Sequence, residues 1–169
     1  MTRRLVVDLA SPRAAWRVPD ATVGAIRAAL GPGWDVVVVD APAISDGDGG
    51  PGTDEAAAAA CGAEVYFGWG VPDRVVDGGR GTLRWAHSGS AGVGGILPRL
   101  DGTGIAFTNS AGVHAEPIAD WVVAAIAYFA RGLDWMLEAQ RAGRWAKDEF
   151  TDRRHPVREL AELRLGVLG

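Results

Sequence analysis

Two kinds of apolar pattern alternate along the chain. Short unbroken runs rich in β-branched residues are typical of strands covered on both faces. Between them, apolar residues recur every three or four positions, which is the spacing of one helical face. Strands alternating with helices indicate an α/β domain with a parallel, doubly wound sheet. The five expected strands are Arg4–Leu9, Asp35–Asp40, Glu64–Trp69, Leu83–Ser88 and Gly104–Asn109.

The helices expected between these strands are short. Apolar residues follow one face of Asp20–Leu30, with Asp20 as the expected capping residue. Thr53 begins an alanine-rich helix that runs to Cys61. A short helix is expected over Pro72–Gly79 and a helical turn around Ile96–Leu100. The first domain is therefore predicted to span residues 1–109.

The pattern changes after the fifth strand. Ala115–Arg131 is apolar nearly all round, so we expect this helix to be buried against more than one neighbour. An amphipathic helix is expected from Leu133 to about Arg144, followed by a polar, irregular segment. Leu165–Leu168 has the pattern of a buried strand, and Gly169 is suited to a phosphate-binding turn. We expect interdomain helices over residues 110–160 and the start of a second, truncated domain over residues 161–169.

Charge, cysteine content and the length of the apolar runs exclude several classes of protein. A net charge of −4 provides no basic surface for nucleic acid. The single cysteine, Cys61, excludes a disulfide framework and is expected to be a small core residue, and no Cys/His spacing suggests a metal site. The N-terminal apolar run is too short for a signal peptide, and the run Trp121–Ala130 is too short to span a bilayer. We expect a soluble, cytoplasmic protein without membrane contacts.

One glycine-rich loop is a candidate for chemistry. The sequence HSGSAGVGG, His87–Gly95, follows the fourth expected strand, and ligands of parallel sheets bind at the carboxyl ends of strands. Glycines allow successive backbone N–H groups to converge on an anion. A tight turn without a ligand fits the same glycines, so the loop alone leaves both readings open.

The order of several segments carries a family resemblance. LRWAHSGSAGVGG is followed by GIAFTNSAGVHAEPIADWVVAAI, a basic Trp-containing segment and ELRLGVLG. From about Glu64 to Gly169, and most clearly in Leu83–Ala130, the chain resembles the D-isomer-specific 2-hydroxyacid dehydrogenases. The resemblance implies a flavodoxin-like substrate domain, an interdomain helix pair and the first strand of a truncated Rossmann domain that binds NAD or NADP. It also implies a homodimer for the full-length protein.

The same resemblance implies roles for particular residues. The loop residues Ser90, Ala91, Gly92 and Val93 would bind the substrate carboxylate through backbone amides, with Ala91 also near the nicotinamide. Gly92 is expected to need a positive φ, which would make Gly92→Val severe. Gly169 would be the first glycine of the dinucleotide fingerprint. Many members have Asp at the position of Gly94, so this chain lacks a side chain that helps to fix the loop.

The hypothesis is therefore the N-terminal portion of an NAD(P)-dependent oxidoreductase that interconverts 2-oxo acids and D-2-hydroxy acids. The family's catalytic Arg, His and carboxylate lie beyond the first Rossmann strand, so no catalytic residue is assigned and the chain alone should be inactive. His87 and His114 are expected to be structural. The alternative is a stand-alone flavodoxin-like binding or receiver-type module, in which Asp8 would contribute to an acidic pocket.

Overall fold

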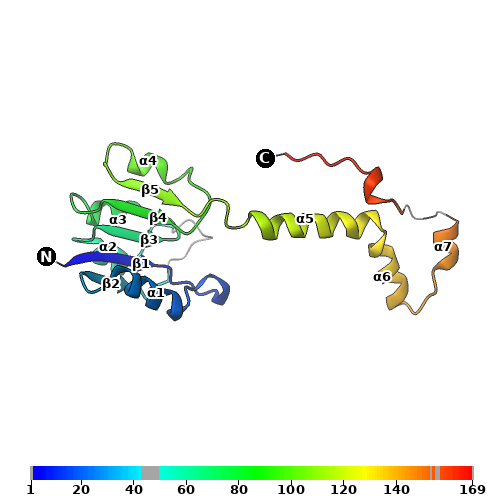
Figure 1. Ribbon diagram of the computed structural model, residues 1–169, viewed down its shortest axis with the longest axis horizontal. Helices are drawn as coiled ribbons and strands as arrows, with labels where there is room; N and C mark the ends of the chain where they lie inside the picture. Colours follow the sequence, from blue (N-terminus) through cyan, green and yellow to red (C-terminus); the bar gives the residue numbers. More distant parts are fainter. Residues whose placement is uncertain (1, 43–49, 153, 155–156, 169) are drawn as a thin grey trace. The chain divides into compact units, whose positions relative to one another are not determined.

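The computed structural model describes residues 2–42, 50–152, 154 and 157–168 (Figure 1). The chain divides into two compact units, Met1–Val113 and His114–Gly169.

The first unit is an α/β domain with one five-stranded sheet. Its strands are β1 (Arg3–Asp8), β2 (Trp34–Val38), β3 (Val65–Gly68), β4 (Trp85–Ser88) and β5 (Ala106–Asn109). They lie in the order β2-β1-β3-β4-β5, and every neighbouring pair is parallel. This is the flavodoxin-like strand order. The prediction of a parallel, doubly wound sheet is confirmed.

The helices of this unit begin and end close to the predicted positions. They are α1 (Asp20–Leu30), α2 (Asp54–Ala60), α3 (Asp73–Gly78) and α4 (Leu97–Leu100), with a 3₁₀ turn η1 at Ala14–Trp16. Thr53 caps α2, because its Oγ1 accepts a hydrogen bond from Ala56 N at 3.0 Å. The prediction for Asp20 is wrong: Asp20 is the first helical residue of α1, and Pro19 occupies the N-cap position without a side-chain hydrogen bond.

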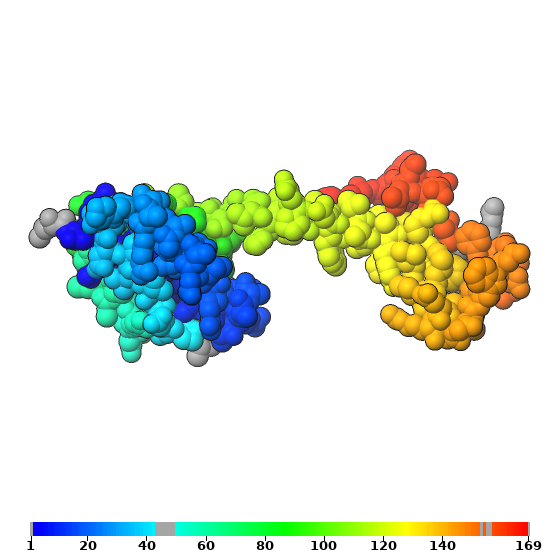
Figure 2. All heavy atoms as spheres, turned by 60° about the horizontal axis from the view of Figure 1, so that its bottom comes forward, coloured from blue at the N-terminus to red at the C-terminus, as the bar shows by residue number. Residues whose placement is uncertain are grey.

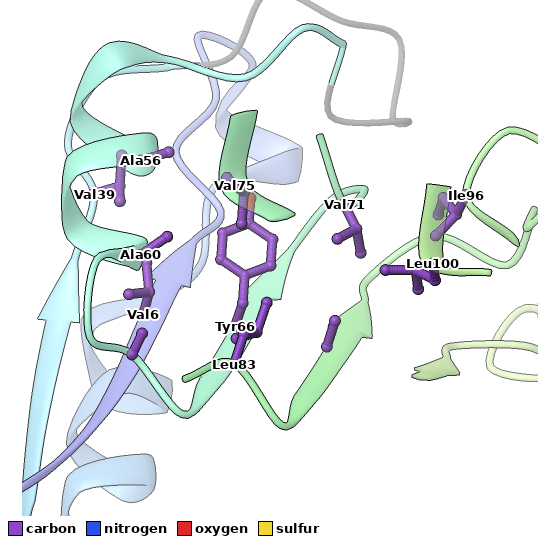
Figure 3. Packing of buried hydrophobic residues seen from close by; sticks show 12 residues of the cluster. Val6, Val39, Ala56, Ala60, Tyr66, Val71, Val75, Leu83, Ile96 and Leu100 are labelled. Atoms are coloured by element: carbon purple, nitrogen blue, oxygen red, sulfur yellow. The ribbon is translucent and has the colours of Figure 1, made fainter. Parts of the chain in front are cut away.

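One face of the sheet is covered by α2, α3 and α4 (Figure 3). Tyr66 lies at the centre of this core, which the strand residues share with small side chains of α2. The approach of α2 to α3 is close: a Cβ at Gly78 would lie 2.6 Å from Ala57 O. The fully buried members are Val6, Val39, Ala56, Ala60, Ala63, Tyr66, Val71, Val75 and Ala86.

The opposite face is covered by α1, which lies on the outside of this unit in Figure 2 (blue). Leu5, Val7 and Leu9 of β1 and its C-terminal extension form this core with Ile26 and Leu30 of α1. Beside α1 a groove of about 600 Å³ remains over β3 and β4, and apolar side chains dominate its lining. They include Leu5, Ile26, Leu30, Trp34, Phe67 and Trp85. Within the described residues, the covering of this face is therefore incomplete.

The second unit contains α5 (Ala115–Ala130), α6 (Leu133–Arg141), α7 (Lys147–Thr151) and a 3₁₀ turn η2 (Leu160–Glu162). The predicted helices are present, but α7 forms where an irregular segment was expected. The expected burial of α5 is not found among the described residues, because none of its side chains is buried. Its large exposed side chains are Ile118, Trp121, Val123 and Phe129.

The strand expected at Leu165–Leu168 is not formed. These residues pair with no strand among the described residues, and Leu165, Val167 and Leu168 are exposed. Strand formation requires a partner for the backbone N–H and C=O groups, which an apolar run does not supply by itself. Gly169 lies outside the described residues. No helix in the described part of the chain is long and apolar enough to cross a membrane.

Candidate functional site

The glycine-rich loop leaves the sheet at its carboxyl edge. It joins β4 to α4, and the parallel register places Gly68 of β3 beside Ser88 and Ser88 beside Asn109 of β5. The loop is therefore bordered by Trp69 after β3 and by Asn109 and Ser110 at the end of β5. This is the edge at which ligands bind to open parallel sheets.

The start of the loop is anchored to the residue that follows β3. Ser88, which is fully buried, and Ser90 both donate a side-chain hydrogen bond to Trp69 O, at 3.0 and 2.7 Å. Ser88 Oγ also accepts from Ser90 N at 3.1 Å, and Gly89 N donates to Gly68 O at 2.7 Å. The amide of Ser90, the first residue of the predicted carboxylate site, is thus already bound within the protein.

The middle of the loop is held from β5. Ser110 N donates to Ser90 O at 3.3 Å, and Asn109 Nδ2 donates to Ala91 O at 2.7 Å. No described peptide bond is cis, so each N–H points opposite to the preceding C=O in the same plane. The N–H groups of Ala91 and Gly92 therefore both point away from the end of β5, and both residues are exposed.

Three successive amides of this loop remain available. Within the described residues, the N–H groups of Ala91, Gly92 and Val93 donate to no protein acceptor. Ala91 and Gly92 are exposed and Val93 is half-buried. Consecutive N–H groups without a protein acceptor favour an anion such as a carboxylate. The structure brings these three residues to the predicted place, together with Ser90 as an anchor.

The positive φ expected at Gly92 is not found. Gly92 does not have a positive φ, and a Cβ added to it would meet nothing within 4 Å. The nearby glycine that does need the left-handed region is Gly112, with φ of 92°, after β5. A valine at position 92 is consequently tolerated by the backbone, and its effect would come only from filling the space beside the amides.

His87 belongs to a chain of hydrogen bonds between β4 and β5. Trp85 Nε1 donates to Thr108 Oγ1 at 2.9 Å, and Thr108 Oγ1 lies 2.8 Å from His87 Nδ1. His87 Nε2 lies 3.3 Å from Ser110 Oγ, which donates to Ser88 O at 3.1 Å. Every link is satisfied when Thr108 donates to Nδ1 and the Nε2–H tautomer donates to Ser110. Burial lowers the pKa of His87, which favours the neutral ring and a structural role.

Asp8 ends β1 in a buried position that sequence reasoning missed. It is 4% exposed, and its Oδ2 accepts a 2.6 Å hydrogen bond from the hydroxyl of Tyr66. Its Oδ1 has no hydrogen-bond partner among the described residues. Burial raises the pKa of Asp8, and the nearby carboxylate of Glu55 adds to the increase, while the Tyr66 hydrogen bond opposes it. Asp8 therefore does not open onto an acidic surface pocket.

Tyr66 reaches Asp8 by lying over Gly68. A Cβ at Gly68 would lie 2.5 Å from the Tyr66 hydroxyl oxygen, so only glycine leaves room for the ring at this position. The sequence signal is a tyrosine followed two residues later by glycine within one strand, opposite an aspartate that ends another.

Cys61, His114 and the C-terminal residues were also singled out in the sequence. Cys61 is exposed rather than buried, because it follows the last residue of α2 at the surface. The described residues contain no group of three or more His, Cys, Asp or Glu side chains that could hold a metal ion. Leu165–Leu168 are not part of a sheet, and Gly169, the expected first glycine of the dinucleotide fingerprint, lies outside the described residues. His114 precedes α5 and forms no side-chain capping bond.

Comparison with known proteins adds no assignment. No protein-family model and no curated protein sequence matches this chain. The features of this chain that bear on function are the strand order, the position of the loop after β4 and the direction of the Ala91 and Gly92 N–H groups.

Proposed function

We propose that this chain provides the substrate-binding unit of an NAD(P)-dependent oxidoreductase that interconverts 2-oxo acids and D-2-hydroxy acids. The observation that carries the proposal is the run of three successive N–H groups at Ala91–Val93 that have no acceptor among the described residues, at the carboxyl edge of a flavodoxin-like sheet. The resemblance to the D-isomer-specific 2-hydroxyacid dehydrogenases in Leu83–Ala130 gives this loop its role.

The loop would bind the carboxylate end of the substrate. Backbone N–H groups bind a carboxylate without requiring a particular side chain, and hydrogen bonds to a charged group are stronger than neutral ones. The reacting 2-oxo carbon would then lie next to the bound carboxylate, outside the edge of the sheet. The proposal assigns no proton donor and no cofactor contact to the described residues, and the chain alone is expected to lack oxidoreductase activity.

The alternative of a receiver-type module is disfavoured by Asp8. Receiver chemistry needs an acidic residue open to solvent, whereas Asp8 is buried against Tyr66 and its pKa is raised. The competing proposal is a binding module without catalysis, in which the same loop would bind the anion.

We further propose that this protein forms a homodimer. The support is α5, whose exposed Ile118, Trp121 and Phe129 form an apolar surface that favours association.

Amide NMR spectra of the 169-residue chain test the carboxylate site. Titration with pyruvate should shift the resonances of Ala91, Gly92 and Val93 selectively, while the uncharged methyl pyruvate should not. Gly92→Val should keep the spectrum of the sheet, because the added Cβ meets no atom within 4 Å, and should weaken pyruvate binding about tenfold or more.

Two results would refute this function. One is the absence of selective shifts in the wild-type loop at high pyruvate concentration. The other is a folded Gly92→Val protein with unchanged pyruvate affinity, which would show that the loop is only a turn. Equal shifts with inorganic phosphate would favour a general anion-binding module over the oxidoreductase.

A further inference from the structure

We propose that Asn109 is the positioning residue of this loop, because its side chain fixes the direction of the Gly92 N–H group. The inference rests on the proposed function for the identity of the bound anion. The direction of the N–H group itself is a separate property and can be measured without any ligand.

The side chain that donates to Ala91 O comes from a residue held in the sheet. Asn109 is the last residue of β5 and lies beside Ser88 in the parallel register, so its backbone is fixed by the sheet. Its Nδ2 donates to Ala91 O at 2.7 Å, across the space between the end of β5 and the loop. Another hydrogen bond from the end of β5, from Ser110 N to Ser90 O, is 3.3 Å long and holds the preceding peptide.

Packing does not hold the peptide between Ala91 and Gly92. Both residues are exposed, and a Cβ at Gly92 would meet nothing within 4 Å. Glycine accepts backbone angles on both sides of the conformational map, so this peptide plane can rotate at little cost. The hydrogen bond to Ala91 O is thus the contact that selects one orientation, with the Gly92 N–H pointing away from β5.

The hydrogen bond to Ala91 O requires a side chain that can donate. Asparagine presents an N–H₂ group to the carbonyl, whereas an aspartate of nearly the same shape presents only acceptors when ionised. Asn109→Asp should therefore repel Ala91 O and attract the Gly92 N–H, which reverses the peptide. Asn109→Ala removes the restraint without favouring the reversed orientation.

The test measures the direction and the binding separately in the 169-residue chain. Residual dipolar couplings of the Gly92 N–H vector report its direction relative to the sheet. We expect the coupling to change in Asn109→Asp and to be averaged in Asn109→Ala, while couplings in β1, β3 and β4 stay unchanged. Pyruvate affinity should fall about tenfold in Asn109→Ala and by more in Asn109→Asp.

Thr82→Ala is the matched control. Thr82 Oγ1 also donates to a backbone carbonyl, Gly79 O at 3.1 Å, but it lies before β4 at the other edge of the sheet. This variant should leave the Gly92 coupling and pyruvate affinity as in the wild type.

The outcomes separate the two proposals. An unchanged Gly92 N–H direction in folded Asn109→Asp and Asn109→Ala proteins would overturn the positioning role, whatever the wild type binds. A changed direction in a protein whose wild type does not bind pyruvate would support the positioning role and overturn the proposed function. If Asn109→Ala does not fold, the nearly isosteric Asn109→Asp decides the question.

Discussion

Removing the Tyr66 hydroxyl should destabilise the first unit through Asp8. In Tyr66→Phe the ring stays in the core, so the change is confined to one oxygen atom and leaves no large cavity. Asp8 Oδ2 then loses its 2.6 Å hydrogen bond, and Oδ1 already has no partner among the described residues. A carboxyl group that is 4% exposed would be left without a hydrogen bond from the described part of the chain.

The size of the stability loss in Tyr66→Phe follows from the burial of the Asp8 carboxyl group. A hydrogen bond to a charged group contributes about 1.5–3 kcal/mol, and leaving a buried polar group unsatisfied costs a similar amount. The carboxyl can reduce this cost by binding a proton, because burial already raises the pKa of Asp8. We therefore expect Tyr66→Phe to lower the free energy of unfolding by about 2 kcal/mol at pH 7.

The pH dependence has a definite sign. Because the folded pKa of Asp8 is raised above 3.8, this group costs stability at neutral pH. Its contribution to stability becomes more favourable as the pH falls through the raised folded pKa towards 3.8. The Tyr66 hydrogen bond lowers the pKa of Asp8, so its loss moves the folded pKa further up. The difference between Tyr66→Phe and wild type should consequently be largest near pH 7 and shrink in acid.

Urea denaturation followed by circular dichroism at pH 7 and pH 4.5 measures both effects. The rest of the chain is identical in wild type and variant, so contributions that do not involve Asp8 or Tyr66 cancel in the difference. In the Asp8→Asn background, Tyr66→Phe should cost much less, since no charge remains to be stabilised. Equal stability of wild type and Tyr66→Phe at pH 7, or a loss that is the same with Asn at position 8, would refute the reasoning.

Three further predictions concern other parts of the chain. Thr53→Ala should lower the free energy of unfolding by about 1 kcal/mol in thermal unfolding because α2 loses its cap, and Thr53→Ser should not; equal losses would contradict the capping role. Nitrogen NMR should show the Nε2–H tautomer of His87 and a pKa below 6.5. Because the unfolded chain binds this proton more readily, the free energy of unfolding should decrease as the pH falls from 6.5 through the folded pKa. Finding a pKa above 6.5 would rule this out. Trp121→Arg should reduce self-association in sedimentation velocity, and a monomeric wild type would remove the basis for the proposed dimer.

The strands of the first unit were predictable because each one carries its own pattern. An unbroken apolar run such as that of β1 or β2 is specified locally, and the structure places all five strands within two residues of the expected positions. Leu165–Leu168 has the same kind of run but forms no strand, because pairing depends on a partner and not on the run. The exposure of Cys61 was likewise set by the end of α2, which composition does not reveal.

The candidate site was predictable in its place but not in its details. A glycine-rich loop after a parallel strand lies at the carboxyl edge by topology, which a sequence can show. The direction of the amides depends on hydrogen bonds across the sheet edge, which Trp69 O accepts and Asn109 Nδ2 donates, and no local pattern contains them. The same limitation explains why the Ser90 amide was expected to be available and why a positive φ was expected at Gly92.

The fit of Tyr66 over Gly68 has an evolutionary consequence. A larger side chain at position 68 would collide with the tyrosine hydroxyl, so such a substitution can become fixed only after position 66 has lost its ring. Once that ring is gone, the buried acid at position 8 has lost its hydrogen-bond donor and destabilises the fold. Selection would then favour an apolar residue at position 8. Among descendants of this sequence, positions 8, 66 and 68 should therefore change as a group, with the loss of the tyrosine at position 66 coming first.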